Sequence, residues 1–182
     1  MKLIILDRDG VINHDSDAFI KTPDEWIPID GSLDAIARLS RGGWHIVVAS
    51  NQSGIARGLF TMDTLTAIHT RMHQAVASAG GRIDAIFICP HGPEDGCACR
   101  KPAPGMLLDI ARRLDVQLED VPVVGDSLRD LQAAAQCGCA PWLVLTGKGR
   151  KTWTESGHLD ALPAGTKVRE NLSAVADSLL KA

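Results

Sequence analysis

The chain has 182 residues, of which 45% are hydrophobic and 23% are charged. These values are those of an ordinary globular protein, and we predict a single domain over residues 1–182. The formal net charge is −3 and no long basic run is present, which argues against nucleic acid as a partner. No window approaches the roughly 18 apolar residues of a membrane span, so we expect no membrane partner and a cytoplasmic protein. A monomer is the default expectation.

Short apolar runs alternate with amphipathic segments along the chain. The expected strands are continuous apolar runs at 3–6, 45–49, 85–89, 121–124 and 142–145, with a short strand at 167–169. The expected helices occupy 32–41, 61–79, 104–114, 128–136 and 172–181. Continuous apolar strands joined by helices predict an α/β fold with a doubly wound parallel sheet, covered on both faces. Ligands of such sheets bind beyond the carboxyl ends of the strands.

Two aspartates follow the first apolar run, in the segment Asp7-Arg8-Asp9-Gly10. Carboxylates this close raise each other's pKa unless a cation neutralises them, which points to bound Mg²⁺ and phosphate chemistry. Asp7 would then attack phosphorus as a nucleophile and form an aspartyl-phosphate. Asp9 would protonate the leaving alkoxide and afterwards activate the water that hydrolyses the intermediate. Taken alone, the pair is also compatible with a solvated turn.

The segment Ser50-Asn51-Gln52-Ser53 directly follows the second apolar run. The Ser50 hydroxyl at a strand end could bind a phosphate oxygen, and the loop after it offers backbone N–H donors. By itself, the segment is more typical of an ordinary turn. Its value as a signal comes from its place among the other segments.

Basic and acidic residues follow the later strands. Lys101, ahead of Pro102, could neutralise both Asp7 and the transferring phosphoryl group, and the planar Arg100 suits a second phosphate or sugar hydroxyls. A solvated basic pair is the alternative. Asp126 leaves the fourth strand at the sheet edge of Asp7 and could complete an octahedral Mg²⁺ site. Asp130 could hold a metal-bound water or a loop amide. Alternatively, it is only an acidic residue in the first turn of a helix, which the helix dipole favours.

Cysteines and a histidine form the pattern C-x-H-x5-C-x-C between residues 89 and 99. Four such ligands suit a closed tetrahedral Zn²⁺ site, which would be structural because no position is left for water. The loop has no core of its own, so the metal would order it and aim Arg100 at the substrate. Disulfides are the alternative, but a bridge between neighbouring cysteines would be strained. The predicted zinc ligands are Cys89, His91, Cys97 and Cys99.

The segments Asp-x-Asp-Gly, Ser-Asn, Lys-Pro and Gly-Asp-x-x-x-Asp, in this order, resemble the haloacid dehalogenase superfamily of Mg²⁺-dependent phosphohydrolases. The resemblance covers about residues 1–147 and implies a Rossmann-like dehalogenase fold. The linkers around the second strand are too short for a mobile cap domain, so we expect a capless, open site. The resemblance implies that Asp7 is the nucleophile and a metal ligand, and that Asp9 is the general acid/base, which also gives its backbone carbonyl to Mg²⁺. It also implies that Ser50 and Lys101 stabilise the phosphoryl group and that Asp126 is a further metal ligand.

Within this superfamily, a capless core with a zinc loop that runs into Arg-Lys-Pro is similar to phosphatases of small sugar bisphosphates. The resemblance implies removal of one phosphate from such a sugar, in the supply of activated sugar for lipopolysaccharide. Substrate contacts would come from Asp15, from Ser50–Ser53, and from Arg100 with Lys101. The role of Ser16–Ala18 and any preference for one anomer stay open.

Three other functions remain as alternatives. Histidinol phosphate bears one phosphate and a cation, so Arg100 would be misplaced and an acidic recognition residue would be expected. A broader small-molecule phosphatase would use the same chemistry. A non-catalytic zinc-knuckle binding module is the remote alternative, because such a module has no need to bury carboxylates around a lysine.

The sequence indicates no functional role for the remaining polar residues. His69 and His73, four apart on the expected helix, are interpreted as surface histidines because no third metal ligand accompanies them. Cys137 and Cys139 are interpreted as buried free thiols. The basic run Lys148–Lys151 is interpreted as a solvated loop rather than a patch against a second phosphate.

Overall fold

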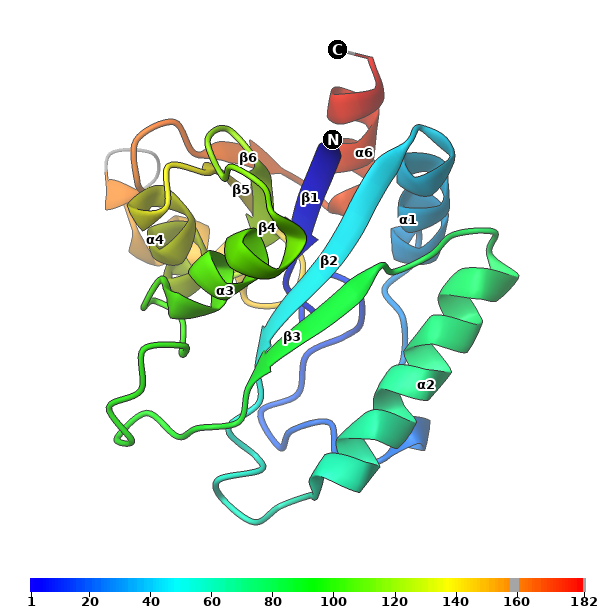
Figure 1. Cartoon of the computed structure of the whole chain (residues 1–182), viewed down its shortest axis with the longest axis vertical. Helices are drawn as coiled ribbons and strands as arrows, with labels where there is room; N and C mark the ends of the chain where they lie inside the picture. Colours follow the sequence, from blue (N-terminus) through cyan, green and yellow to red (C-terminus); the bar gives the residue numbers. More distant parts are fainter. Residues whose placement is uncertain (158–160, 182) are drawn as a thin grey trace.

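The computed structural model describes residues 1–157 and 161–181. Its strands form one parallel sheet in the order β3-β2-β1-β4-β5-β6 (Figure 1). Strands β2 and β3 follow β1 on one side of the sheet, and β5 and β6 follow β4 on the other side. The direction of the strand order therefore reverses between β1 and β4. The bounds are β1 Lys2–Leu6, β2 Trp44–Asn51, β3 Ala85–Cys89, β4 Pro122–Gly125, β5 Ala140–Val144 and β6 Lys167–Arg169.

Helices cover both faces of the sheet. The first core, on one face, contains side chains of α1, α2 and α6, and the second core, on the other, contains those of α3 and α4 (Figure 1). None of the helices within the described residues is long and apolar enough to cross a membrane. The bounds are α1 Ser32–Arg41, α2 Met62–Ser78, α3 Gly105–Leu114, α4 Leu128–Gln136, α5 Gly149–Glu155 and α6 Leu172–Leu180, with a short 3-10 helix η1 at Pro23–Glu25.

Strand β1 shows why the strands are continuously apolar. Ile4 and Leu6 belong to the first core, and Leu3 and Ile5 to the second. Successive side chains of a strand point to opposite faces, so a strand buried on both sides needs apolar residues at every position. The predicted doubly wound α/β fold is therefore confirmed.

All predicted strands and helices are present, with ends within two residues of expectation. Strand β2 continues through the polar Ser50 and Asn51, which pair with Ile88 and Cys89 of β3. The prediction of a solvated loop at Lys148–Lys151 is wrong, because helix α5 begins at Gly149. Trp153 of this helix packs against a small cluster around β5, which a basic run does not reveal.

The segment between β1 and α1 folds back on itself. Ile29 N donates to Ile12 O (3.0 Å) and His14 N to Ile27 O (2.9 Å), which forms an isolated antiparallel bridge between Asn13 and Pro28. Trp26, only 1% exposed, anchors this segment in the first core. The position of the segment that carries Asp9 is therefore fixed by the packing of Trp26 as well as by the connection to β1.

Replacing Trp26 with alanine should destabilise the protein by about 3–5 kcal/mol, because the cavity left behind adds to the lost burial. Urea unfolding measures this change. Ile27→Ala is the matched control, since Ile27 is 56% exposed and its truncation should change stability by less than about 0.5 kcal/mol. Equal losses in the two variants would contradict the anchoring role of Trp26.

Candidate active site

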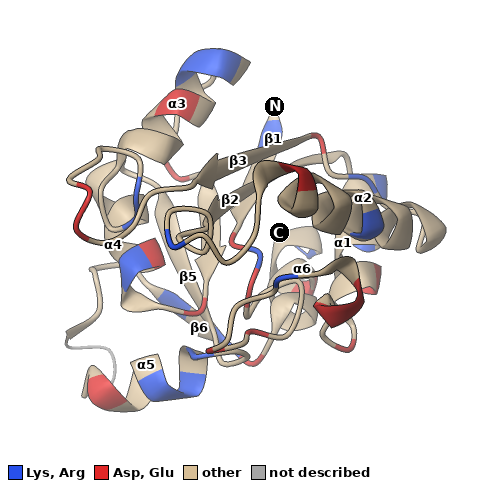
Figure 2. Ribbon diagram, turned by 90° about the horizontal axis from the view of Figure 1, so that it is seen from below, with Lys and Arg blue, Asp and Glu red and all other residues tan. Residues whose placement is uncertain are grey.

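The carboxyl ends of β1, β2 and β4 lie side by side and place the predicted polar residues together. Figure 2 views the molecule from below, the side to which the strand arrows of Figure 1 point. Asp7 follows β1, and its N–H donates to Val124 O of β4 (2.9 Å). A cavity of about 300 Å³ opens here. The predicted residues that line it are Asp7, Asp9, Asp15, Asn51, Gln52, Ser53, Arg100, Lys101, Asp126 and Asp130.

A buried lysine lies at the floor of this cavity. Lys101 Nζ is 3.1 Å from Asp7 Oδ1 and 2.6 Å from Asp130 Oδ1, and it donates to Ala49 O (2.7 Å). Burial disfavours the ammonium, but Asp130 and Asp7 outweigh this and raise the pKa of Lys101. The lysine is therefore a permanent positive charge between two carboxylates.

Three carboxylates at the floor could hold a cation. Asp7, Asp126 and Asp130 each offer an oxygen, and these oxygens lie within 4.8 Å of one another. Burial, with smaller contributions from neighbouring carboxylates, raises the pKa of Asp7 to about 7 and that of Asp126 to about 8. The excess of negative charge over Lys101 fits a divalent cation with oxygen ligands.

Asp130 is more fully engaged than the other two carboxylates. Its Oδ1 faces Lys101, and its Oδ2 accepts from Ser127 N (3.1 Å) and Ser127 Oγ (2.6 Å) in a capping box at the start of α4. Lys101 also lowers the pKa of Asp130 against the effect of burial. Asp130 therefore balances the charge of Lys101 and caps α4.

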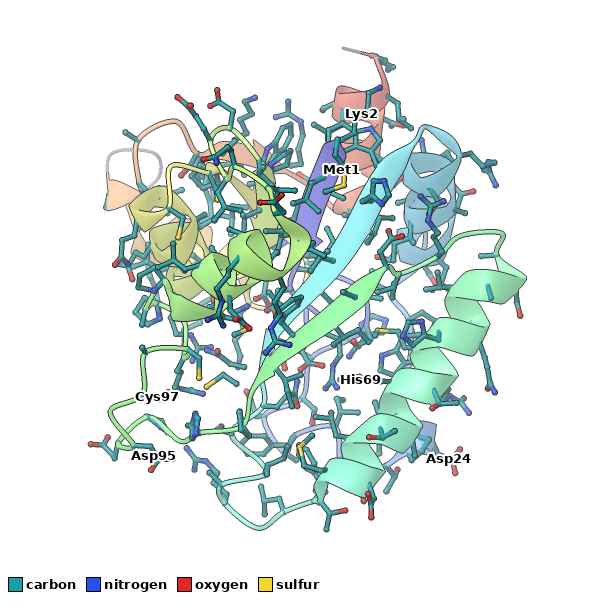
Figure 3. The ribbon with its side chains drawn as sticks, viewed as in Figure 1. Met1, Lys2, Asp24, His69, Asp95 and Cys97 are labelled. Atoms are coloured by element: carbon teal, nitrogen blue, oxygen red, sulfur yellow. The ribbon has the colours of Figure 1, made fainter. Side chains whose placement is uncertain are left out.

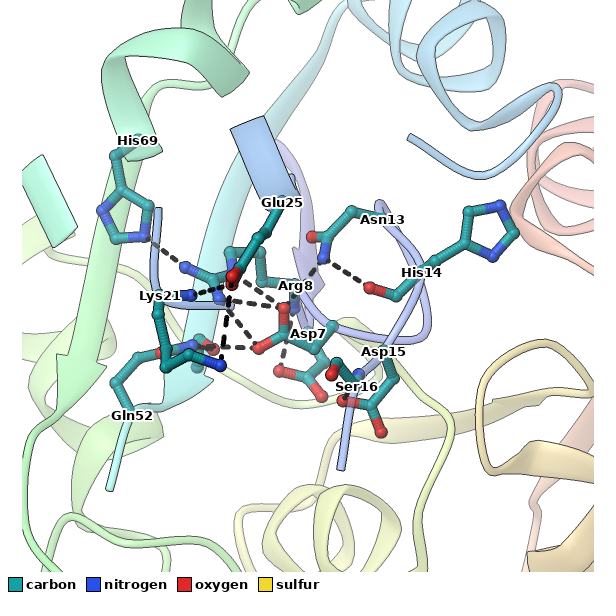
Figure 4. Close-up of polar contacts among 12 residues, drawn as sticks. Asp7, Arg8, Asn13, His14, Asp15, Ser16, Lys21, Glu25, Gln52 and His69 are labelled. Carbon is teal, nitrogen blue, oxygen red and sulfur yellow. Dashed lines mark hydrogen bonds and ion pairs between the residues drawn. The ribbon is translucent and has the colours of Figure 1, made fainter. Parts of the chain in front are cut away.

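Asp9 is not part of the carboxylate cluster. It accepts hydrogen bonds from Arg8, Asn13 and Gln52, and Figure 4 labels these three donors. Burial opposes its ionisation, but the charge of Arg8 and these hydrogen bonds prevail and hold the pKa of Asp9 below its usual value. Of the predicted Mg²⁺ ligands, Asp7 and Asp126 are therefore in the carboxylate cluster. The Asp9 side chain is not, so Asp9 could contribute only its backbone carbonyl, as the resemblance implied.

The residues after β2 support the floor. Asn51 Nδ2 donates to Lys101 O (3.0 Å) and Asn51 Oδ1 accepts from Lys101 N (3.1 Å), which fixes the lysine backbone. Ser50 is buried, and its Oγ accepts from Gln52 Nε2 (2.8 Å). Ser50 is not among the residues that line the cavity, whereas Asn51, Gln52 and Ser53 are.

Four cationic side chains line the cavity wall: Arg57, Arg100, Arg129 and Lys148. Burial and then the charge of Arg129 lower the pKa of Arg100, so the arginines repel one another and an anion would be stabilised here. Sequence reasoning named only Arg100. Lys148, assigned to a solvated loop, in fact lies at the site, where its Nζ is 3.0 Å from Asp15 Oδ2. The run of basic residues gave no sign that this loop folds back on the cavity.

The predicted zinc ligands come together at the end of β3, which contributes Cys89, and on the loop that follows, where Figure 3 labels Cys97. Cys89 Sγ lies 3.6 Å from Cys97 Sγ and 3.2 Å from Cys99 Sγ, and His91 Nδ1 lies 3.3 Å from Cys99 Sγ. Tetrahedral Zn–S bonds of about 2.3 Å would separate two sulfurs by about 3.8 Å, close to these values. All five cysteines are free thiols, so the disulfide alternative is wrong.

His69 is not the surface residue that the sequence predicted. It is half-buried on α2, and its Nε2 lies 3.3 Å from a terminal nitrogen of Arg8 (Figure 4). Burial, followed by the charge of Arg8, lowers the pKa of His69 to about 4. His73, one turn further along α2, is exposed as expected.

The comparisons with known proteins agree with this geometry. A family model of haloacid dehalogenase-like hydrolases matches residues 3–138, and the chain belongs to this family. It is 68% identical, over 100% of its length and 99% of the relative, to the D-glycero-beta-D-manno-heptose-1,7-bisphosphate 7-phosphatase of Bordetella bronchiseptica. It is 54% identical to the enzyme of that name from Pseudomonas putida, over 99% of this chain and 100% of the relative.

The structure is also similar to solved structures of phosphatases of the same name. The crystal structure of the D,D-heptose 1,7-bisphosphate phosphatase from B. bronchiseptica, complexed with magnesium and phosphate, superposes with a TM-score of 0.96, at 68% identity and coverage of 100% and 99% of the two chains. The corresponding phosphatase from Burkholderia thailandensis has a TM-score of 0.78, at 49% identity and full coverage of both chains. The prediction of a dehalogenase-type phosphatase is confirmed.

Proposed function

We propose that this protein is a Mg²⁺-dependent phosphatase that removes the C7 phosphate of D-glycero-β-D-manno-heptose 1,7-bisphosphate. The product would be heptose 1-phosphate, for nucleotide-activated heptose and lipopolysaccharide. The observation that carries the proposal is the buried Lys101 between Asp7 and Asp130 at the floor of a cavity whose wall is cationic. The full-length identity of 68% to a phosphatase of this substrate supports the assignment and the β anomer.

Asp7 is the proposed nucleophile. Its Oδ1 faces Lys101 Nζ, which would neutralise both the carboxylate and the incoming phosphoryl group. Asp7, Asp126 and the backbone carbonyl of Asp9 would hold Mg²⁺, next to Asp130 in the same carboxylate cluster. The ion would supply further positive charge to the phosphoryl oxygens. Asp7 then displaces the sugar C7 oxygen from phosphorus and becomes an aspartyl-phosphate.

Asp9 is the proposed general acid and base. Because Arg8 keeps Asp9 ionised at rest, Asp9 would take up a proton from solvent before each turnover and would give it to the departing C7 oxygen of the sugar in the first step. In the second step Asp9 takes a proton from the water that attacks the aspartyl-phosphate, which frees inorganic phosphate and restores Asp7. The hydrogen bonds from Asn13 and Gln52 fix the carboxylate for both steps.

The cationic wall favours a substrate with a second phosphate. Arg100 would bind the C1 phosphate, and Arg57 and Arg129 add positive charge to the same wall. Histidinol phosphate carries an ammonium group at its other end, which these arginines would repel. Asp15, paired with Lys148, lies on the cavity wall where a sugar hydroxyl could be bound.

The cluster of Cys89, His91, Cys97 and Cys99 is the proposed structural Zn²⁺ site. All four ligand atoms lie within 4.8 Å of one another, so no rearrangement is needed to surround an ion. Arg100 follows the last ligand and donates to His91 O (3.3 Å). Zinc would therefore hold the segment that carries Arg100 and Lys101.

The substrate proposal predicts phosphate release from the β anomer at least about tenfold faster, in kcat/KM, than from the α anomer, histidinol phosphate or fructose 1,6-bisphosphate. The product should retain its C1 phosphate, which ³¹P NMR detects. Asp7→Asn should remove the activity while the fold, measured by circular dichroism, stays intact. Comparable slow turnover of all four substrates would contradict the proposed substrate, and activity in Asp7→Asn would contradict the mechanism.

The zinc proposal predicts one equivalent of zinc in the purified protein, measured by mass spectrometry with inductively coupled plasma. Cys97→Ser should lose most of this zinc and raise KM more than it lowers kcat, because Arg100 loses its support. Cys137→Ser is the matched control, since this thiol lies outside the cluster, and should keep the metal. Full activity of the zinc-free protein would contradict the proposed role.

A further inference from the structure

A buried hydrogen-bond chain connects helix α2 to the proposed general acid. It runs from His69 through Arg8 to Asp9, and Figure 4 labels His69 and Arg8. Nothing in the proposed mechanism uses its first two members. We infer that His69 is a positioning residue, which holds the Arg8 guanidinium so that it fixes the carboxylate of Asp9. The inference rests on the proposed function, because it assigns a role to Asp9.

The Asp9 carboxylate is held from several directions. Its Oδ1 accepts from Arg8 Nε (3.0 Å), Arg8 Nη2 (2.9 Å) and Asn13 Nδ2 (2.9 Å), and its Oδ2 accepts from Arg8 Nη2 (3.0 Å) and Gln52 Nε2 (3.0 Å). Arg8 supplies three of these five contacts. The direction of the Asp9 carboxylate therefore depends chiefly on the place of one guanidinium.

Arg8 is itself completely buried, with 0% of its surface exposed. Its Nε and Nη2 are used on Asp9, which leaves Nη1 to find another acceptor. His69 Nε2 is at 3.3 Å. A buried guanidinium nitrogen without a partner costs free energy, so the contact with His69 stabilises Arg8 in this position.

The chemistry of the pair fixes the state of His69. A guanidinium only donates hydrogen bonds, so His69 Nε2 must be the acceptor and the ring must be neutral, with its proton on Nδ1. Burial and the charge of Arg8 favour this neutral form. A histidine that is half-buried at the edge of the apolar face of α2, beside Leu65 and Ile68, thus offers a lone pair to the site.

The test uses two substrates that differ in their need for an acid. The alkoxide of the sugar requires a proton from Asp9 as it leaves, whereas p-nitrophenolate leaves without one. The parameter kcat/KM covers the steps up to the formation of the aspartyl-phosphate, so it isolates the acid step. Because a small misplacement of a catalytic group costs up to about 10²-fold, His69→Leu should lower kcat/KM for heptose 1,7-bisphosphate about tenfold. The value for p-nitrophenyl phosphate should stay within about twofold.

Two further variants control the result in the metal-loaded protein. His69→Gln keeps an acceptor for Arg8 and should restore kcat/KM for the sugar to within about threefold of the wild type. His73→Leu removes an exposed histidine from the same helix and should change neither substrate. Thermal unfolding of each variant shows whether it is folded at the assay temperature.

Equal losses on the two substrates, or no loss on either, would overturn the inference. So would a failure of His69→Gln to restore the activity of a folded protein. The proposed function is judged separately, from the wild-type protein alone. If the wild type did not cleave the heptose bisphosphate but cleaved fructose 1,6-bisphosphate, the role of His69 would be tested on that alkyl phosphate. The ratio of kcat/KM between each variant and the wild type would be measured in the same way.

Discussion

The site depends on one buried ammonium among carboxylates. Lys101 is 3% exposed and touches Asp7 and Asp130. A buried charge is strongly unfavourable without partners, and removing one member of a buried pair typically costs about 3–5 kcal/mol. The surroundings of Lys101 are therefore constrained: Asn51 holds its backbone, Ala49 accepts from its ammonium, and the capping box of α4 fixes Asp130.

The fold brings these groups together at the point where the strand order reverses. Strands β1 and β4 are neighbours, so Asp7 and Asp126 leave the sheet side by side. Gly10 closes the first turn with a φ of +83°, and a Cβ there would lie 1.9 Å from an Asp126 oxygen. This close approach leaves no room for a side chain, so only glycine permits it. The sheet sets the floor of the cavity, and the loops after the strands carry the cationic wall.

Much of this arrangement could be predicted from the sequence, for identifiable reasons. Continuous apolar runs such as Leu3–Leu6 mark strands buried on both faces, and the polar residues that follow such runs must meet at one sheet edge. The cluster of Cys89, His91, Cys97 and Cys99 was predictable because its members lie close together in the sequence. These signals are local in the sequence, and that is why Asp7, Lys101 and Asp126 were found.

The contacts that escaped prediction depend on how distant segments pack. Arg8 occupies a position that the Asp-x-Asp pattern leaves unspecified, and His69 lies on a helix whose apolar pattern does not say which loop it meets. Lys148 reaches the site because its loop folds back, where Lys148 N donates to Asp126 Oδ2 (2.8 Å) and Thr146 Oγ1 to Gly10 O (2.6 Å). Neither helix propensity nor charge pattern encodes such tertiary contacts.

The measurement that tests the central claim most directly is the capture of phosphorylated Asp7. The Asp9→Asn variant with Mg²⁺ is mixed with p-nitrophenyl phosphate, which needs no acid to load the nucleophile, and is quenched in acid before mass spectrometry. Because the variant lacks the base for the second step, we predict a single phosphoryl group on the peptide that contains Asp7. Release of phosphate with no adduct, or an adduct on another residue, would contradict the account.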